Sequence, residues 1–280
     1  MPFPPISDTM PNSSPIPGPK ILLMGGSGSG KTYSIRTLIQ AGITPFCVFT
    51  EPGQEVLGDL PPEKLHWHYI PPASQSWDAM IDAAQKVNQY SFESLTKMTD
   101  SNKKQYNQFE QLLHVFHNFT CQRTGEKFGD VSEWPTSRAL VVDSLSGLSI
   151  MAMNQMTGGK PVRDQKDWGV AQNMLEFLVQ KLCMDVQCTM VMIAHPEREI
   201  DEVAGGMKIM TSTLGKKLAP KIPRFFSDVV MAQREGKTFT WSTAATSADL
   251  KARNLPIADG LPPTFVQIIE AWKKQGGTIG

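Results

Sequence analysis

Short runs of apolar residues alternate along the chain with longer stretches in which apolar residues recur every three or four positions. The short runs predict strands buried on both faces, and the longer stretches predict helices with one apolar face. Strands and helices that alternate in this way indicate an α/β fold with a mostly parallel central sheet and helices on both faces. Strands are expected at 21–24, 46–50, 65–70, 139–142 and 189–194, a hairpin at 229–232 and 239–241, helices at 32–41, 77–98, 103–119 and 168–184, and a loop at 122–137.

The two ends of the chain differ from its middle. Residues 1–19 contain seven prolines and few side chains that could form a core, so we expect an extended, flexible arm there. A single folded domain is predicted over 20–272, followed by a flexible tail at 273–280.

Composition excludes several classes of protein. The 280 residues carry 27 Lys and Arg against 27 Asp and Glu, so the formal net charge is zero. This balance argues against a uniformly basic coat for nucleic acid or membrane, although a local basic patch stays compatible with it. Four cysteines without a CxxC pair and the absence of an apolar run near ~18 residues favour a reduced, cytoplasmic protein without a membrane span.

One motif carries a specific chemistry. Residues 25–32 fit the pattern G-x-x-x-x-G-K-[ST] at every fixed position, between a predicted strand and a predicted helix. Glycines allow backbone N–H groups to turn onto phosphate oxygens, and the start of a helix adds its positive end. The motif therefore predicts ATP as ligand and Mg²⁺ as cofactor, with phosphates on Lys31 and the metal on Thr32. The predicted cradle consists of Gly25, Gly26, Ser27, Gly28, Ser29, Gly30, Lys31 and Thr32.

Two carboxylates could complete a nucleotide site. Asp143 ends the apolar run 139–142, which is the position of the acid that joins the Mg²⁺ shell in P-loop proteins, and it is therefore also counted among the nucleotide-binding residues. Ser144 follows it, so the common acidic pair at this point is missing. Glu51 ends the second predicted strand, and it would reach the same sheet edge if that strand lay beside the one ending in Asp143. It is the candidate base for hydrolysis, with an ordinary loop glutamate as the alternative.

These motifs resemble the RecA-like recombinase ATPases, which place a catalytic glutamate after the second core strand and a serine after the Walker B aspartate. The resemblance implies a RecA-like P-loop NTPase core. His195, after the run 189–194, matches the position that senses the γ-phosphate, although a structural histidine is the alternative. Lys251 and Arg253 resemble the Lys-x-Arg element that reaches a neighbouring subunit's γ-phosphate, with a solvated basic turn as the alternative.

Small phage-encoded RecA-like ATPases, some of which anneal single strands, are the group that the chain resembles most. This resemblance implies a homo-oligomer, either a filament or a ring, with ATP at the subunit interfaces. It also implies single-stranded DNA as partner, a single-strand-binding protein as a candidate partner, and the host cytoplasm as location. The long interval between Lys31 and Asp143 leaves room for a helical insertion over about 73–134.

Two segments match the DNA-contacting loops of that family. The first is 154–168, and the second follows His195 and includes 207–224, where five cations occur without an acidic residue. Clustered cations beside glycines suit a phosphate backbone, and a solvated basic loop is the alternative. The candidate DNA contacts are Lys160, Arg163, Lys208, Lys216, Lys217 and Lys221.

The leading hypothesis is an Mg²⁺-dependent ATPase that binds single-stranded DNA for annealing or strand exchange. A ring-forming helicase or loader shares the same core, so the sequence barely separates it from this hypothesis. A nucleotide-gated binding module without turnover is a third reading. A small-molecule kinase is less favoured because we find no arginine-rich lid.

Overall fold

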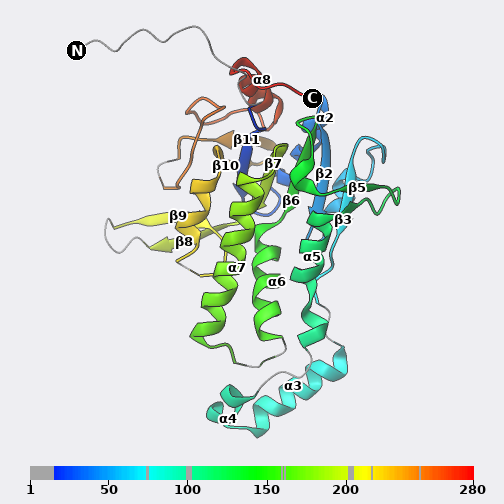
Figure 1. Cartoon of the computed structure of the whole chain (residues 1–280). Coiled ribbons are helices and arrows are strands. Elements are labelled where there is room, and N and C mark those ends of the chain that lie inside the picture. The colour runs from blue at the N-terminus through cyan, green and yellow to red at the C-terminus, as the bar shows by residue number, and fades with distance from the viewer. Residues whose placement is uncertain are drawn as a thin grey trace, which may run out of the picture.

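A computed structural model describes residues 16–73, 76–98, 103–158, 160, 162–200, 205–215, 217–245 and 247–280. Its centre is a sheet of seven strands in the order β11-β10-β1-β7-β6-β2-β3 (Figure 1). Neighbouring strands run parallel except for the β10–β11 pair. The strands are β1 (Lys20–Gly25), β2 (Thr44–Phe49), β3 (His66–Tyr69), β6 (Arg138–Asp143), β7 (Thr189–Ala194), β10 (Asp228–Glu235) and β11 (Thr238–Ser242).

The central strands are apolar throughout because both faces of the sheet are covered. In β1, Leu22 and Met24 belong to one hydrophobic core, whereas Ile21 and Leu23 belong to another on the opposite face. This alternation is the period of two that a strand imposes on its side chains. The α/β fold with a mostly parallel sheet, expected from the sequence, is confirmed.

Helices cover the two faces of the sheet. The longer helices α5, α6 and α7 contribute to the core that contains Leu22, and the helices α2 and α8 contribute to the core that contains Ile21. The helices and 3₁₀ helices of the main body are α1 (Lys31–Ser34), α2 (Arg36–Gln40), η1 (Gln54–Leu57), η2 (Lys103–Tyr106), α5 (Gln108–His117), η3 (Val131–Glu133), α6 (Leu145–Thr157), α7 (Gln165–Met184), η4 (Ala219–Phe225) and α8 (Val266–Lys274).

Three smaller features lie outside the main sheet. The helices α3 (Trp77–Gln89) and α4 (Phe92–Lys97) project from one end of the molecule (Figure 1). The strands β4 (Phe119–Thr120) and β5 (Lys127–Gly129) form one hairpin, and β8 (Pro196–Ile200) and β9 (Met207–Thr211) form another. In the described part of the chain, no helix is both long and apolar enough to cross a bilayer.

Several elements differ from the sequence-based expectation. The helix expected at 77–98 is broken, because Ser91 caps a new helix by accepting a hydrogen bond from the Ser94 N–H. The helix expected at 103–119 divides into η2 and α5, that at 32–41 divides into α1 and α2, and the expected loop 122–137 contains β5 and η3. Helices α6 and α8 and the β8–β9 hairpin were not expected.

The chain ends contact the body where they are described. Trp272 Nε1 donates to Pro17 O at 3.0 Å, and Gly18 N donates to Gln187 O at 2.8 Å. The expected tail 273–280 begins inside α8, and Gly280 N donates to Thr136 Oγ1 at 2.9 Å. Most of the proline-rich arm, residues 1–15, lies outside the described residues.

Candidate functional site

The glycine-rich loop between β1 and α1 encloses the Lys31 ammonium group. Gly30 adopts φ 83° directly before α1, a left-handed conformation that favours glycine. Lys31 Nζ donates to Gly25 O at 2.6 Å and to Gly26 O at 2.8 Å, and the side chain is buried. Burial lowers the pKa of Lys31, and the nearby Asp143 and Glu51 carboxylates oppose this shift. The loop thus holds a cation at the point where a phosphate chain would lie.

Thr32 and Asp143 come together from distant parts of the chain. Thr32 Oγ1 donates to Asp143 Oδ2 at 2.6 Å, because β1 and β6 flank β7 and end at the same edge of the sheet. Burial raises the pKa of Asp143, while the hydrogen bond from Thr32 lowers it. A hydroxyl beside a buried carboxylate is the oxygen donor set that Mg²⁺ prefers, so these two residues fit the predicted metal site.

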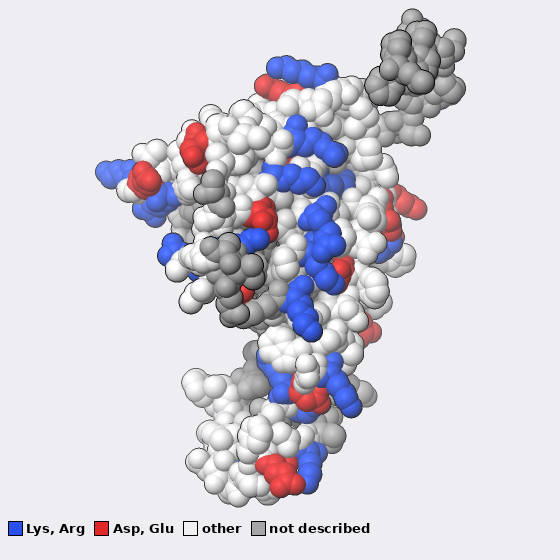
Figure 2. All heavy atoms as spheres, turned by 90° about the vertical axis from the view of Figure 1, so that its left-hand side faces the viewer, with Lys and Arg blue, Asp and Glu red and all other residues white. Residues whose placement is uncertain are grey.

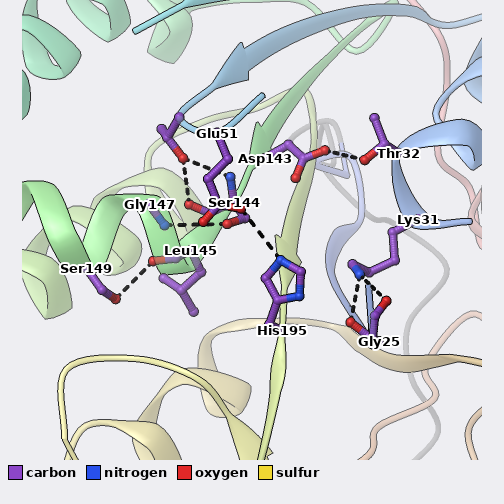
Figure 3. Close-up of polar contacts among 12 residues, drawn as sticks. Gly25, Lys31, Thr32, Glu51, Asp143, Ser144, Leu145, Gly147, Ser149 and His195 are labelled. Carbon is purple, nitrogen blue, oxygen red and sulfur yellow. Dashed lines mark hydrogen bonds and ion pairs between the residues drawn. The ribbon is translucent and has the colours of Figure 1, made fainter. Parts of the chain in front are cut away.

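Glu51 and His195 face each other across the same edge (Figure 3). Glu51 follows β2, which pairs with β6, and His195 follows β7, which pairs with β6 on its other side. The distance from His195 Nε2 to Glu51 Oε2 is 3.6 Å. The contact with His195 is the largest cause that lowers the pKa of Glu51, and partial burial opposes it. Glu51 is therefore held as a carboxylate at neutral pH.

The ends of β2 and β6 are locked together directly behind these carboxylates. Ser144 N donates to Thr50 Oγ1 at 2.9 Å, and the Thr50 N–H donates to Asp143 O at 2.8 Å. Gly147 lies in the first turn of α6 (Figure 3). It packs against Thr50 and leaves no space for a Cβ. The Asp143–Ser144 peptide is cis. The two hydrogen bonds and the Gly147 contact fix Glu51 and Asp143, which are the neighbours of Thr50 and Ser144, relative to each other.

A cavity of about 800 Å³ opens over these side chains. Lys31, Thr32, Glu51, Asp143 and His195 all line it, as do Ser27, Gly28, Ser29 and Gly30 of the cradle. Sequence reasoning missed two aromatic residues in the wall, Tyr33 and Phe239. Phe239 lies against the backbone of Gly30, since a Cβ there would be 3.0 Å from its ring. An aromatic residue on the second strand of a hairpin carries no motif, so no sequence signal pointed to it.

Comparison with known families decides the class of protein. Residues 17–254 match the AAA_24 family, whose description is AAA domain. The chain belongs to the AAA_24 family. It is accordingly a P-loop ATPase with a RecA-like α/β core. A comparison with curated proteins found no match.

Two solved structures are distantly similar to this AAA_24 protein. The crystal structure of the RadB recombinase matches with 13% sequence identity and a TM-score of 0.34, and the match covers 88% of this chain and 86% of the RadB chain. The crystal structure of the flagellar accessory protein FlaH from Methanocaldococcus jannaschii matches with 11% sequence identity and a TM-score of 0.32, and the match covers 81% of this chain and 77% of the FlaH chain. At this distance, no property of either protein is transferred to the chain.

Lys251 and Arg253 of the AAA_24 chain do not line the nucleotide cavity. Lys251 forms an isolated β-bridge with Val229, near the start of β10. Gly25, which opens the phosphate loop, pairs with Ala232 further along β10. Lys251 Nζ donates to Phe226 O at 2.6 Å, and the buried Asp228 accepts the Arg253 N–H at 2.9 Å. The Lys251 side chain and the Arg253 backbone are therefore anchored near the start of β10, at the opposite end of the sheet from the loop.

Half of the candidate DNA contacts make ion pairs. Lys160 pairs with Asp164 and Asp167 at 3.3 and 3.1 Å, because the expected loop 154–168 is largely the end of α6 and the capped start of α7. Lys208 pairs with Asp249 at 2.9 Å, and Lys221 pairs with Glu176 at 2.7 Å. Arg163 and Lys217 are exposed and make no ion pair with another described residue, and Lys216 lies outside the described residues.

Cations nevertheless gather on one side of the molecule. Figure 2 shows Lys and Arg side chains in a row on the face that includes the β8–β9 hairpin. A second cavity of about 410 Å³ is lined by Arg163 just before α7, by Trp168 in the first turn of α7, and by Ser212 after β9. Ser212 N donates to His195 O at 2.8 Å. This cavity is thus one hydrogen bond away from the nucleotide site.

Proposed function

We propose that this AAA_24 protein is an Mg²⁺-dependent ATPase that assembles head to tail and binds single-stranded DNA during recombination, by annealing or strand exchange. The observation that supports the enzymatic part is the pairing of Glu51 with His195 in the cavity that also contains Lys31, Thr32 and Asp143. A phosphate cradle, a metal ligand pair and a candidate base converge there, which is the set of groups that hydrolysis needs.

In this proposal each residue has a defined task. Lys31 holds the β- and γ-phosphates, while Thr32 and Asp143 would hold Mg²⁺, which neutralises phosphate charge when bound. Glu51 accepts a proton from the attacking water as the water oxygen bonds to the γ-phosphorus and the bond to the ADP oxygen breaks. The lowered pKa of Glu51 keeps this carboxylate ready to accept the proton at neutral pH.

His195 is proposed to report the state of the γ-phosphate. Its ring contacts Glu51 on one side, and its backbone carbonyl accepts the hydrogen bond from Ser212 at the second cavity. A shift of His195 on nucleotide binding would therefore move a wall of that cavity. Trp168 and Arg163 in the same wall suit a stacked base and a phosphate, so the second cavity is the proposed contact for single-stranded DNA.

Two substitutions test the enzymatic part of the proposal. Lys31→Ala should abolish ATP turnover because the phosphates lose their cation, and Glu51→Gln should lower kcat by at least about 100-fold with ATP binding retained. Glu55→Gln is the matched control, since this exposed glutamate is four residues away and lies outside the cavity wall. Phosphate release and binding of a fluorescent ATP analogue give the two readouts.

The outcomes separate the competing functions. Unchanged turnover in Lys31→Ala would remove the assignment of the phosphate cradle. ATP binding without turnover in the parent chain would identify a nucleotide-gated binding module. Unwinding of duplex DNA by closed rings would identify a motor, whereas ATP-dependent retention of a labelled oligonucleotide on filaments would support the recombination function.

A further inference from the structure

Helices α3 and α4 form an arm, residues 76–98, in which the large apolar side chains other than Leu95 are exposed to solvent. No residue of α3 is buried. Trp77 is 79% exposed and Phe92 is 72% exposed, although both are large aromatic residues. Helices of this length are stable in proteins mainly because an apolar face is covered by another element. The arm therefore has a face that requires a partner.

Five apolar residues of α3, including its four largest, lie on one side of the helix. They occur at i, i+3, i+4, i+7 and i+10, which at 3.6 residues per turn places them within a single stripe about 15 Å long. The same stripe carries no charged residue. Its members are Trp77, Met80, Ile81, Ala84 and Val87.

The exposed apolar area of the arm is large enough for a stable contact. Trp77, Tyr90 and Phe92 each have about 150–250 Å² of surface, and with the aliphatic residues the exposed part is on the order of 600 Å². Each partner in a standard interface buries about 800 Å². Aromatic residues also dominate the binding energy of such interfaces.

The charges on the arm argue against a membrane or a nucleic acid as the partner. Its cations Lys86 and Lys97 pair with Asp82 at 2.6 Å and Glu93 at 2.8 Å. Asp78 adds a further negative charge, so the arm carries a small excess of acid. Anionic lipid surfaces and phosphate backbones attract basic helices, which this one is not. A protein surface is the remaining class of partner.

A matching surface exists on α7 of the same chain. Val170, Phe177 and Met184 are exposed at intervals of seven residues, which aligns them along about 21 Å of the helix. Phe177 is 69% exposed and Met184 is 64% exposed. On α3, Trp77 and Ala84 as well as Met80 and Val87 are separated by the same interval. Two helices with this spacing pack side by side in the manner of a coiled coil.

We propose that the arm of one chain packs on α7 of a second copy. The two surfaces are different, so each copy uses its arm on one neighbour and offers α7 to the next. Such heterologous contacts propagate into a ring or a filament. The inference deepens the head-to-tail assembly in the proposed function, on which it rests, by naming the surfaces that meet.

Sedimentation velocity of the full chain, with and without ATP, tests this assembly. The arm variant Trp77→Ser/Ile81→Ser and the receptor variant Phe177→Ser/Met184→Ser should both sediment as monomers of 30.9 kDa. We expect self-association to weaken by at least about tenfold in each variant, because a central aromatic anchor is lost. The control Asp78→Ser/Gln89→Ser makes the same change on the other side of α3 and should assemble like the parent.

A mixture of the two variants is the decisive experiment. It should form dimers and nothing larger, because an intact arm from one variant meets an intact α7 from the other only once. The proposal is overturned if the parent is monomeric, if either variant assembles normally, or if the mixture stays monomeric. Binding of a fluorescent ATP analogue should persist in every variant, because neither surface lies in the nucleotide cavity. A parent chain that assembles but does not turn over ATP would refute the enzymatic proposal and leave the arm–α7 contact standing.

Discussion

Replacing Gly147 with alanine is expected to disturb both carboxylates of the nucleotide site. A Cβ at this position would overlap Thr50 Oγ1 and lie 2.7 Å from Thr50 Cβ, so Thr50 or the first turn of α6 has to move. Thr50 precedes Glu51, and Ser144, which exchanges hydrogen bonds with Thr50, follows Asp143. A shift at this contact therefore displaces the candidate base and the candidate metal ligand together.

The magnitude follows from the atoms involved. Overpacking costs about 1–3 kcal/mol and the two Thr50–Ser144 hydrogen bonds contribute about 2 kcal/mol, while alanine gains about 1 kcal/mol over glycine in a helix. The unfolding free energy should fall by roughly 2–4 kcal/mol. A displacement of about 1 Å at the reacting groups should lower kcat by on the order of 100-fold. Denaturant unfolding and steady-state phosphate release measure the two effects.

Gly169→Ala in α7 provides the matched control for this substitution. No atom lies within 4 Å of a Cβ at that position, so the change should be neutral or stabilise the chain by up to about 1 kcal/mol. The double variant Thr50→Ala/Gly147→Ala should lose less stability than the sum of its single changes, because one overlapping atom is gone. Parental stability and turnover in Gly147→Ala would refute the reasoning.

Three further predictions concern charge. Asp143→Asn should raise the unfolding free energy at pH 7 by about 0.5–2 kcal/mol while abolishing Mg²⁺-dependent turnover, because burial raises the pKa of Asp143 and its charge opposes folding. This gain in stability should disappear at pH values below the pKa of the unfolded carboxyl, where Asp143 of the parent is protonated in both the folded and the unfolded state. Thermal unfolding of both proteins over a pH series measures the gain, and a gain that persists at low pH would contradict the prediction. His195→Ala should raise the pKa of Glu51, because the contact that lowers it is lost, and the acidic limb of the kcat–pH profile should move to higher pH. If the limb does not move, the group that titrates there is not Glu51. Binding of a single-stranded oligonucleotide should show a log–log salt slope of about −3, because Arg163, Lys166, Lys217 and Arg224 are the exposed cations of 154–168 and 207–224 with no ion pair to a described residue. A slope of about −5 would mean that the paired lysines Lys160, Lys208 and Lys221 leave their carboxylates and contact phosphate.

The edge of the sheet that holds the candidate nucleotide site could be predicted from sequence because each residue there follows a recognisable strand. Lys31 and Thr32 carry a pattern with fixed spacing, and Asp143 ends an apolar run. The expectation that Glu51 would meet Asp143 depended on β2 lying beside β6, and the register of these two strands confirms it. Parallel strands bring their carboxyl ends to one edge, so position along the chain is enough to place such side chains.

The loops and their charges could not be predicted in the same way. Lys208 meets Asp249, and Lys221 meets Glu176, across long intervals of sequence that no local pattern connects. Helix α6 is apolar on most of its surface because β-strands and α7 cover it, so its sequence lacks the one-sided periodicity that marked the other helices. Two of the five cations in the acid-free run 207–224 are therefore paired in the fold with carboxylates from other parts of the chain.

The position of Lys251 and Arg253 limits what these residues can do. The Lys251 side chain and the Arg253 backbone are held at the start of β10, and the glycine loop lies beside Ala232, about 10 Å further along that strand. A paired strand in the middle of a sheet does not bend enough to close this distance, and Asp228 fixes the backbone of Arg253 from within the core. If the two cations serve a γ-phosphate at all, that phosphate belongs to a nucleotide bound by another copy. A chain unable to assemble would then bind ATP with normal affinity and hydrolyse it slowly, and adding Lys251→Ala to the arm variant would lower its turnover no further.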